Sequence, residues 1–322
     1  ESEPRRASNM ANGQQKTLAF NSGDAGNHHY HQWPTKEPIG WLHIMHGMAE
    51  HGGRYADLAG FLNQQGIMVT AGDHRGHGLT GSAVDSLYHV ADNDGWNQMV
   101  DDQCQLIGHI ATEHDLPLVI LGHSMGSFMA THFCQRFAKE FTSKQLKGLI
   151  LSGSNYDAPA AFKVFAGLAK IERLRLGGRK ISNLLETLSF GAFNRAFKPN
   201  RTEKDWLSRD HGMVDTYIAD PMCGGAISTQ SWYDFLSGLA QLFTPKALAQ
   251  IDKELPVYLF AGELDPVGKQ GKGVKKFQEI LQQIGIEQVD LKLYAKGRHE
   301  MINETNRTEV YDDILKWLQA RF

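Results

Sequence analysis

The hydrophobic pattern of the chain predicts alternating strands and helices. Short apolar runs bounded by turn residues are typical of buried strands, and several recur along the sequence. They lie at residues 41–45, 67–71, 116–121, 146–151, 255–261 and 289–294. Between them, apolar residues recur at three- and four-residue spacing, as in residues 96–110 and 310–318, which predicts amphipathic helices. This alternation indicates βαβ units and an α/β protein with a mostly parallel sheet.

Two segments depart from this alternation. Residues 16–20 and 28–33, separated by a stretch rich in glycine and asparagine, predict an antiparallel hairpin that completes an eight-stranded sheet flanked by helices. Between residues 155 and 239 no core strand is apparent, and a structureless loop of that length is uncommon inside a compact domain. We therefore predict an inserted helical cap. The expected units are a disordered N-terminal segment, a two-part core and the cap, at residues 1–15, 16–155 with 240–322, and 156–239.

Composition narrows the class of protein. The chain has 322 residues, 41% of them hydrophobic, with 33 basic and 36 acidic side chains, so no basic excess suggests a nucleic-acid partner. Its three cysteines are scattered, which favours reduced thiols and a cytoplasmic location. No apolar stretch approaches the roughly 18 residues of a spanning helix. These features predict a cytoplasmic globular enzyme of undetermined oligomeric state.

The strongest chemical signal is Gly122-His-Ser-Met-Gly126, which lies between an apolar strand pattern and a helical pattern. A nucleophilic serine needs a tight strand-to-helix turn that exposes its hydroxyl, and glycines two residues away let the neighbouring backbone pass close by. In a chain with 33 glycines the bare motif is weak, but its context is specific. Ser152 and Ser154 also follow a strand, without flanking glycines. The sequence therefore predicts Ser124 as a nucleophile.

Acyl transfer also requires two backbone N–H donors aimed at the developing oxyanion. One donor normally belongs to the residue after the nucleophile, here Met125, and the other to the loop after the first core strand. That loop has the sequence H-G-M-A-E-H-G-G-R-Y at residues 46–55, which points to Met48. We expect the rest of the loop to support the hole, through His46, Gly47, Glu50, His51 and Arg54.

Together with G-D-H-R-G-H-G at residues 72–78, these motifs resemble the monoacylglycerol lipase and lysophospholipase family of α/β-hydrolases. K-D-W-L-S-R at 204–209 and D-P-M-C-G at 220–224 are similar to the cap of microbial lysophospholipase-like members. The resemblance covers roughly residues 40–320 and implies a capped, cofactor-free serine hydrolase of monoacyl lipids or related esters. The chain departs from it at Ser127, where many relatives have glycine.

The remaining members of a catalytic triad follow in chain order, each in a loop after a strand. Asp265 follows the apolar run 255–261 and matches the family's G-x-x-D pattern, with Glu263 as a competitor nearer the strand. His299 follows the run 289–294. We therefore predict that His299, oriented by Asp265, activates Ser124 to form an acyl-enzyme.

Fifteen histidines raise the question of a metal site, which requires several ligands converging at fixed geometry. His46, His51, His74 and His77 lie in loops that the resemblance already explains. We expect them to join the two loops by hydrogen bonds, with a Glu50–Arg54 ion pair, and we expect neither a metal nor another cofactor.

The cap carries many large apolar residues, most of which would pack it onto the core. A minority should line an acyl site, because such sites are concave and largely apolar. Our candidates are Phe162, Phe165, Leu188 and Phe193. The basic stretch 170–180 also suggests transient contact of the cap with a membrane surface. Alternatives are a short-chain carboxylesterase, a serine aminopeptidase and a non-catalytic scaffold.

Overall fold

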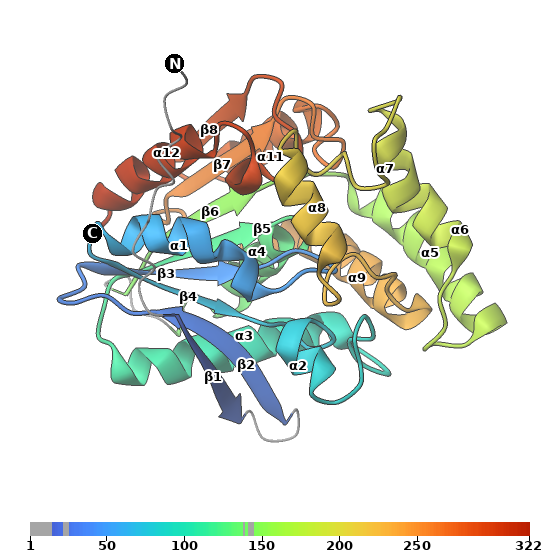
Figure 1. Cartoon of the computed structure of the whole chain (residues 1–322), viewed down its shortest axis with the longest axis horizontal. Helices are drawn as coiled ribbons and strands as arrows, with labels where there is room; N and C mark the ends of the chain where they lie inside the picture. The colour runs from blue at the N-terminus through green and yellow to red at the C-terminus, as the bar shows by residue number, and fades with distance from the viewer. Residues whose placement is uncertain (1–14, 22–25, 138, 141–144) are drawn as a thin grey trace, which may run out of the picture.

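A computed structural model describes residues 15–21, 26–137, 139–140 and 145–322, and its centre is an eight-stranded sheet (Figure 1). The strand order is β1-β2-β4-β3-β5-β6-β7-β8, with β1 and β2 antiparallel to their neighbours and the rest parallel. The strands are β1 Lys16–Asn21, β2 Asn27–Trp33, β3 Gly40–Met45, β4 Ile67–Gly72, β5 Leu118–His123, β6 Leu146–Ser152, β7 Val257–Gly262 and β8 Val289–Tyr294. The predicted mostly parallel α/β fold is confirmed. The predicted disorder of residues 1–15 lies outside the described residues except at Gln15.

Two predicted strands begin later than their apolar runs. Leu116 and Leu255 each precede a proline, and β5 and β7 start at the residue after it. Proline has no N–H to give to the ladder, so it is confined to strand ends in a sheet interior. The carbonyls of Pro117 and Pro256 still accept hydrogen bonds from the neighbouring strands, at 2.8 and 3.0 Å. The run of apolar residues therefore overestimates the length of each of these two strands at its N-terminal end.

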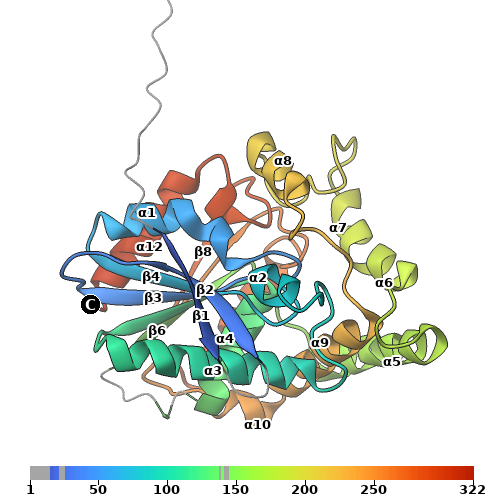
Figure 2. The same cartoon turned by 60° about the horizontal axis from the view of Figure 1, so that its bottom comes forward.

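Helices cover both faces of the sheet and enclose two hydrophobic cores (Figure 2). On one face α1 (Ala56–Asn63) and α12 (Arg307–Gln319) pack together over the central strands. The other face is covered by α3 (Gly95–Glu113), α4 (Met125–Phe137) and α11 (Lys272–Gln283). Short helices lie in the loops, at η2 Gly52–Tyr55, α2 Gly78–Ser82, α10 Pro245–Leu248 and η4 Met301–Asn303. None of the described helices is both long and apolar enough to cross a bilayer.

The segment between β6 and β7 is helical and extends beyond the carboxyl ends of the parallel strands (Figures 1 and 2). It consists of α5 Pro159–Leu176, α6 Asn183–Glu186, η3 Thr187–Gly191, α7 Ala192–Arg195, α8 His211–Ala219 and α9 Thr229–Leu242. Helix α9 packs along α5 and also against α3 and α4, so it connects this segment to the core. We refer to residues 156–239 as the cap, a division that stays our proposal.

Candidate active site

Ser124 occupies the sharp turn between β5 and α4. Its φ of 52° lies in the left-handed region, which a non-glycine residue rarely adopts. A Cβ at Gly122 would lie 2.2 Å from the Gly126 carbonyl oxygen, and one at Gly126 would lie 2.0 Å from the Met45 carbonyl oxygen. Both positions therefore require glycine, because Gly122 lies against the first turn of α4 and Gly126 lies against the end of β3. The turn aims the N-terminus of α4, which begins at Met125, toward the site.

Ser127, where the chain departs from its relatives, holds this turn from behind. Its hydroxyl lies 2.6 Å from the Ser124 carbonyl oxygen and 2.9 Å from the Ser154 hydroxyl, in a fully buried position. The backbone N–H of Ser124 donates to the Ser152 carbonyl at 2.9 Å. The serine at 127 thus adds a polar connection between the turn and the loop after β6.

His299 and Asp265 form a buried pair beside Ser124. His299 Nδ1 lies 2.9 Å from Asp265 Oδ1, and Val267 N–H donates to the same oxygen at 2.9 Å. Burial alone would lower the pKa of His299, but the carboxylates around it, Asp265 first and then Glu300 and Glu50, together raise the pKa. His299 lines one small cavity together with Ser124. The competitor Glu263 is exposed, whereas Asp265 is buried, so the geometry favours Asp265.

The loop after β3 is fixed against Ser124 by a buried carboxylate. Glu50 Oε1 accepts hydrogen bonds from the Gly47 N–H and, at 2.9 Å, from the Tyr55 hydroxyl. A Cβ at Gly47 would lie 3.3 Å from the Ser124 Cβ, so this loop touches the nucleophile. Met48, the next residue, and Met125 both line a cavity with Ser124. The two proposed oxyanion donors therefore flank the serine.

Arg54 connects this loop to the loop of His299 through Glu300, a residue that sequence reasoning missed. Arg54 pairs with Glu50 and binds Glu300 in a bidentate manner, with both N–O distances at 2.8 Å. Burial favours the neutral acid, yet Arg54 overrides it and lowers the pKa of Glu300 to about 2. Glu300 directly follows His299, and this adjacency was its only sequence signal.

His46 and His74 join the loops after β3 and β4. The His74 N–H donates to His46 Nε2 at 3.0 Å, and His74 Nε2 donates to the His46 carbonyl at 3.1 Å. Burial lowers the pKa of His46 well below its usual value and that of His74 to about 3, so both rings are neutral at pH 7. Their role is therefore structural, as a hydrogen-bonded connection.

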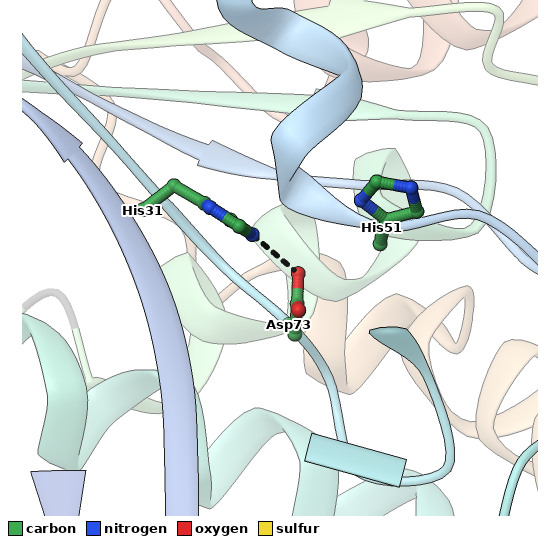
Figure 3. A group of neighbouring side chains, drawn as sticks. All are labelled: His31, His51 and Asp73. Carbon is green, nitrogen blue, oxygen red and sulfur yellow. Dashed lines mark ion pairs between the residues drawn. The ribbon is translucent and has the colours of Figure 1, made fainter. Parts of the chain in front are cut away.

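His31, His51 and Asp73 form one of two groups among the described residues that could hold a metal ion (Figure 3), and His51, Asp220 and Cys223 form the other. Within each group the ligand atoms lie within 4.8 Å of one another. In the first group each atom already has a protein neighbour: Asp73 accepts from Gly52 N–H and Leu79 N–H at 2.8 Å, and His31 Nε2 lies 3.3 Å from Asp73. His51 Nδ1 accepts from Gly53 N–H, while its Nε2 lies 2.8 Å from Asp220 of the cap. These contacts fit a hydrogen-bonded connection between β2, the loops after β3 and β4, and the cap better than an open coordination site.

A mainly apolar cavity of about 300 Å³ extends from Ser124 beneath the cap. The structure brings all four predicted cap residues to its wall, namely Phe162, Phe165, Leu188 and Phe193. Phe165 and Leu188 are about half exposed, so the cavity reaches the surface between α5 and η3. Trp206 and Phe190 line both this cavity and the small cavity at His299. The Trp206 ring lies 4.9 Å from the His299 ring, between centroids.

The chain is similar to several known lipases and esterases. A monoacylglycerol lipase of Mycolicibacterium smegmatis is 29% identical over 90% of this chain and 91% of its own length. The human monoglyceride lipase is 27% identical over 89% and 85%. A thermostable carboxyl esterase from Bacillus coagulans, solved in complex with glycerol, superposes with a TM-score of 0.86 at 26% identity, covering 95% of this chain and 98% of that one.

The resemblance to monoacylglycerol lipases that the motifs indicated is thus confirmed. The family model that matches is Hydrolase_4, described as serine aminopeptidase S33, and it aligns with residues 36–306. That match includes the turn at Ser124, the loop after β3 and the residues of the proposed triad. The chain therefore belongs to the Hydrolase_4 family of α/β-hydrolases.

Proposed function

We propose that the protein is a serine carboxylester hydrolase that cleaves monoacylglycerol- or lysophospholipid-type esters. The observation that carries the proposal is the buried His299–Asp265 pair beside Ser124, whose backbone has a left-handed φ and which lies at the end of an apolar cavity. The similarity to monoacylglycerol lipases and to a carboxyl esterase supports ester hydrolysis over other chemistries of this fold. The triad and the acyl-enzyme are part of the proposal.

The mechanism follows from the positions of these groups. His299 Nε2 takes the proton from the Ser124 hydroxyl, whose oxygen attacks the ester carbonyl carbon. The N–H groups of Met48 and Met125 stabilise the oxyanion, and such a donor typically contributes about 2.7–4 kcal/mol. The C–O bond then breaks, and His299 protonates the leaving alcohol. Water attacks the acyl-enzyme with His299 again as the base, releasing the carboxylic acid and restoring the Ser124 hydroxyl.

The apolar cavity supports a monoacyl substrate of appreciable chain length. Its wall is made of aromatic and aliphatic side chains from α4, α5 and α9, a lining suited to an acyl chain. A short-chain carboxylesterase would leave most of this cavity unused. A chain-length series of p-nitrophenyl and monoacylglycerol esters distinguishes the two: an optimum at acetate or butyrate would contradict the proposal.

The aminopeptidase alternative, which the family description also raises, requires a free carboxylate to bind the substrate ammonium. The two carboxylates that line the small cavity, Glu50 and Glu300, are already paired with Arg54. We therefore expect no hydrolysis of aminoacyl anilides.

The direct test of the catalytic role is Ser124→Ala. We expect loss of turnover with an unchanged melting temperature, because the substitution removes one oxygen and keeps the turn. Ser154→Ala, close to the elbow, is the matched control and should retain labelling by a fluorophosphonate probe. Hydrolysis by pure Ser124→Ala protein at the wild-type rate would refute the assignment of Ser124 as the nucleophile.

We further propose that the cap contacts membrane surfaces transiently. Val164, Ile171 and Leu174 are each more than 60% exposed along α5, and Lys163 and Lys170 lie on the same helix. An exposed apolar stripe with basic neighbours favours adsorption to anionic lipid. In vesicle sedimentation with phosphatidylglycerol, Leu174→Glu should weaken binding; equal binding of this variant and wild type would exclude the contact.

A further inference from the structure

A basic groove on the cap borders the catalytic cavity. It has a volume of about 1140 Å³ and runs along α6, η3, α7 and the loop that follows. Its lining carries four cations and two carboxylates, namely Arg195, Lys198, Arg201 and Lys204 against Glu186 and Glu203. Phe190 and Lys204 line both this groove and the small cavity of Ser124 and His299. These two side chains therefore form the wall between the groove and the reaction centre.

The ammonium group of Lys204 forms no direct ion pair with its charged neighbours in the described part of the chain, Glu186 and Glu203. Within the described part of the chain, nothing accepts a hydrogen bond from Nζ or forms an ion pair with it; its closest recorded contact is the Phe190 ring, with the centroid at 5.7 Å. Glu186, one of the two carboxylates in the groove, accepts a hydrogen bond from Trp232 Nε1 at 3.1 Å and acts on Lys204 only through its charge. Burial lowers the pKa of Lys204, which means that its charge is incompletely solvated.

The position of Lys204 is fixed relative to the catalytic histidine. Its Cε would lie 3.5 Å from a Cβ at Gly224, so the side-chain stem rests on the loop after α8. The segment that begins at Lys204 is hydrogen-bonded to the His299 loop: the His299 N–H donates to the Trp206 carbonyl at 3.4 Å, and the Glu300 N–H donates to the Leu207 carbonyl at 2.7 Å. The backbone that follows Lys204 is therefore held beside the His299 loop.

The two cavities assign the two halves of an ester to different sides of Ser124. With the acyl chain of the proposed substrate in the apolar cavity, the alcohol half would lie on the side of His299, where Phe190 and Lys204 line both the small cavity and the groove. In a lysophospholipid the phosphate is joined to the scissile oxygen through the glycerol carbons, and it extends in the same direction as the alcohol.

We propose that Lys204 and the basic groove bind the phosphate of an anionic head group, so that the preferred substrate is a lysophospholipid rather than a neutral monoacylglycerol. This proposal rests on the ester hydrolysis proposed above and names its substrate class. A partly desolvated ammonium forms a strong charge-assisted hydrogen bond with a phosphate oxygen. Arg195 and Lys198, both exposed on the groove, add long-range attraction for the same anion.

The experiment compares two soluble substrates with the same short acyl chain, a 1-acylglycerol 3-phosphate and the corresponding 1-acylglycerol. Both are used below their aggregation limits, so that binding to a lipid surface does not contribute. Lys204→Met should lower kcat/KM for the phosphate ester by about tenfold or more, the range of a lost charged hydrogen bond. The same variant should stay within about twofold of wild type on the neutral ester, and Lys204→Arg should retain most of the preference.

Lys246→Met is the matched control, because it removes one exposed lysine outside the groove and changes the net charge equally. Equal loss on both substrates in Lys204→Met would mean that the residue only supports the fold, and would overturn the proposal. So would an absent preference in wild type. If wild type hydrolyses neither ester, the proposed function itself fails, which is a different result.

A competition experiment shows whether the groove binds the phosphate of a head group or any free anion. Glycerol 3-phosphate should inhibit hydrolysis of the neutral ester by wild type, and should do so much less with Lys204→Met. If inorganic phosphate inhibits as strongly as glycerol 3-phosphate, the groove binds free anion and the head-group assignment is wrong.

Discussion

The catalytic loops of the core and the helices of the cap meet at the same cavity, yet they are held in different ways. In the core, buried charges and neutral histidines fix the loops through short polar contacts, as in the pair of Arg54 with Glu300. In the cap, the residues that line the cavity are apolar, and several are about half exposed. This difference fits our proposal that the core supplies the chemistry, which needs exact geometry, and that the cap supplies the substrate preference, which needs shape and charge.

Polar contacts join the cap to the loop after β3, in addition to the packing of α9 on the core. The Tyr217 hydroxyl donates to the Ala49 carbonyl at 3.0 Å, and the Gly224 N–H donates to the same oxygen at 2.9 Å. His51 and Asp220 add a further contact at 2.8 Å. These bonds end on the loop of the proposed oxyanion hole, so the cap is aligned with the reaction centre itself.

The largest effect is expected from Asp265→Asn in the core. The amide cannot stabilise the imidazolium and favours the wrong histidine tautomer, which lowers kcat by about 10⁴-fold in a serine protease triad. Steady-state hydrolysis of a p-nitrophenyl ester, with circular dichroism for folding, measures the loss. Glu263→Gln, the exposed competitor, is the control and should keep wild-type activity.

The same variant tests the pKa of the base. His299 must be neutral to accept a proton, and its pKa is raised above 6.5 because Asp265, together with Glu300 and Glu50, outweighs burial. The acid limb of kcat/KM should therefore lie above pH 6.5 in wild type and fall to lower pH in Asp265→Asn. A limb at or below pH 6.5 in wild type would contradict the proposed pair.

The next effect concerns stability. Arg54→Met leaves Glu50 and Glu300 buried without their cation, and removing one partner of a buried pair costs about 3–5 kcal/mol. Urea unfolding measures the change. Lys276→Met, in an exposed pair with Glu279, should cost at most about 1 kcal/mol. Similar losses in both variants would remove the distinction between the rigid core loops and the surface.

The smallest effect is expected in the cap. Leu188→Ala shortens a half-exposed wall of the acyl cavity, so kcat/KM for long-chain esters should fall by about three- to tenfold, the value of one or two methylene contacts. Hydrolysis of an acetate ester and the melting temperature should not change. If acetate hydrolysis falls equally, Leu188 supports the catalytic loops, and the separation between core and cap fails at this position.

Local chemistry made most of the fold and the proposed triad predictable from the sequence. Short apolar runs marked the strands. A serine between glycines after a strand marked the turn, because the close backbone contacts on either side of the serine leave no room for a side chain at the two glycines. Glu300 was missed because its partner, Arg54, is 246 positions away. Lys204 was noted only as part of the K-D-W-L-S-R motif, because whether a lysine has an ion-pair partner depends on groups that only the fold brings near it.

The sequence alone determined the order of strands and helices, the inserted helical segment and the candidates Ser124, Asp265 and His299. The tertiary structure decided which distant groups meet: Asp73 with the oxyanion loop, Arg54 with the loop of His299, and Lys204 with the wall of the small cavity. The physical reason is that periodicity and turn chemistry act over a few residues, whereas charge pairing and cavities depend on segments that only packing brings together.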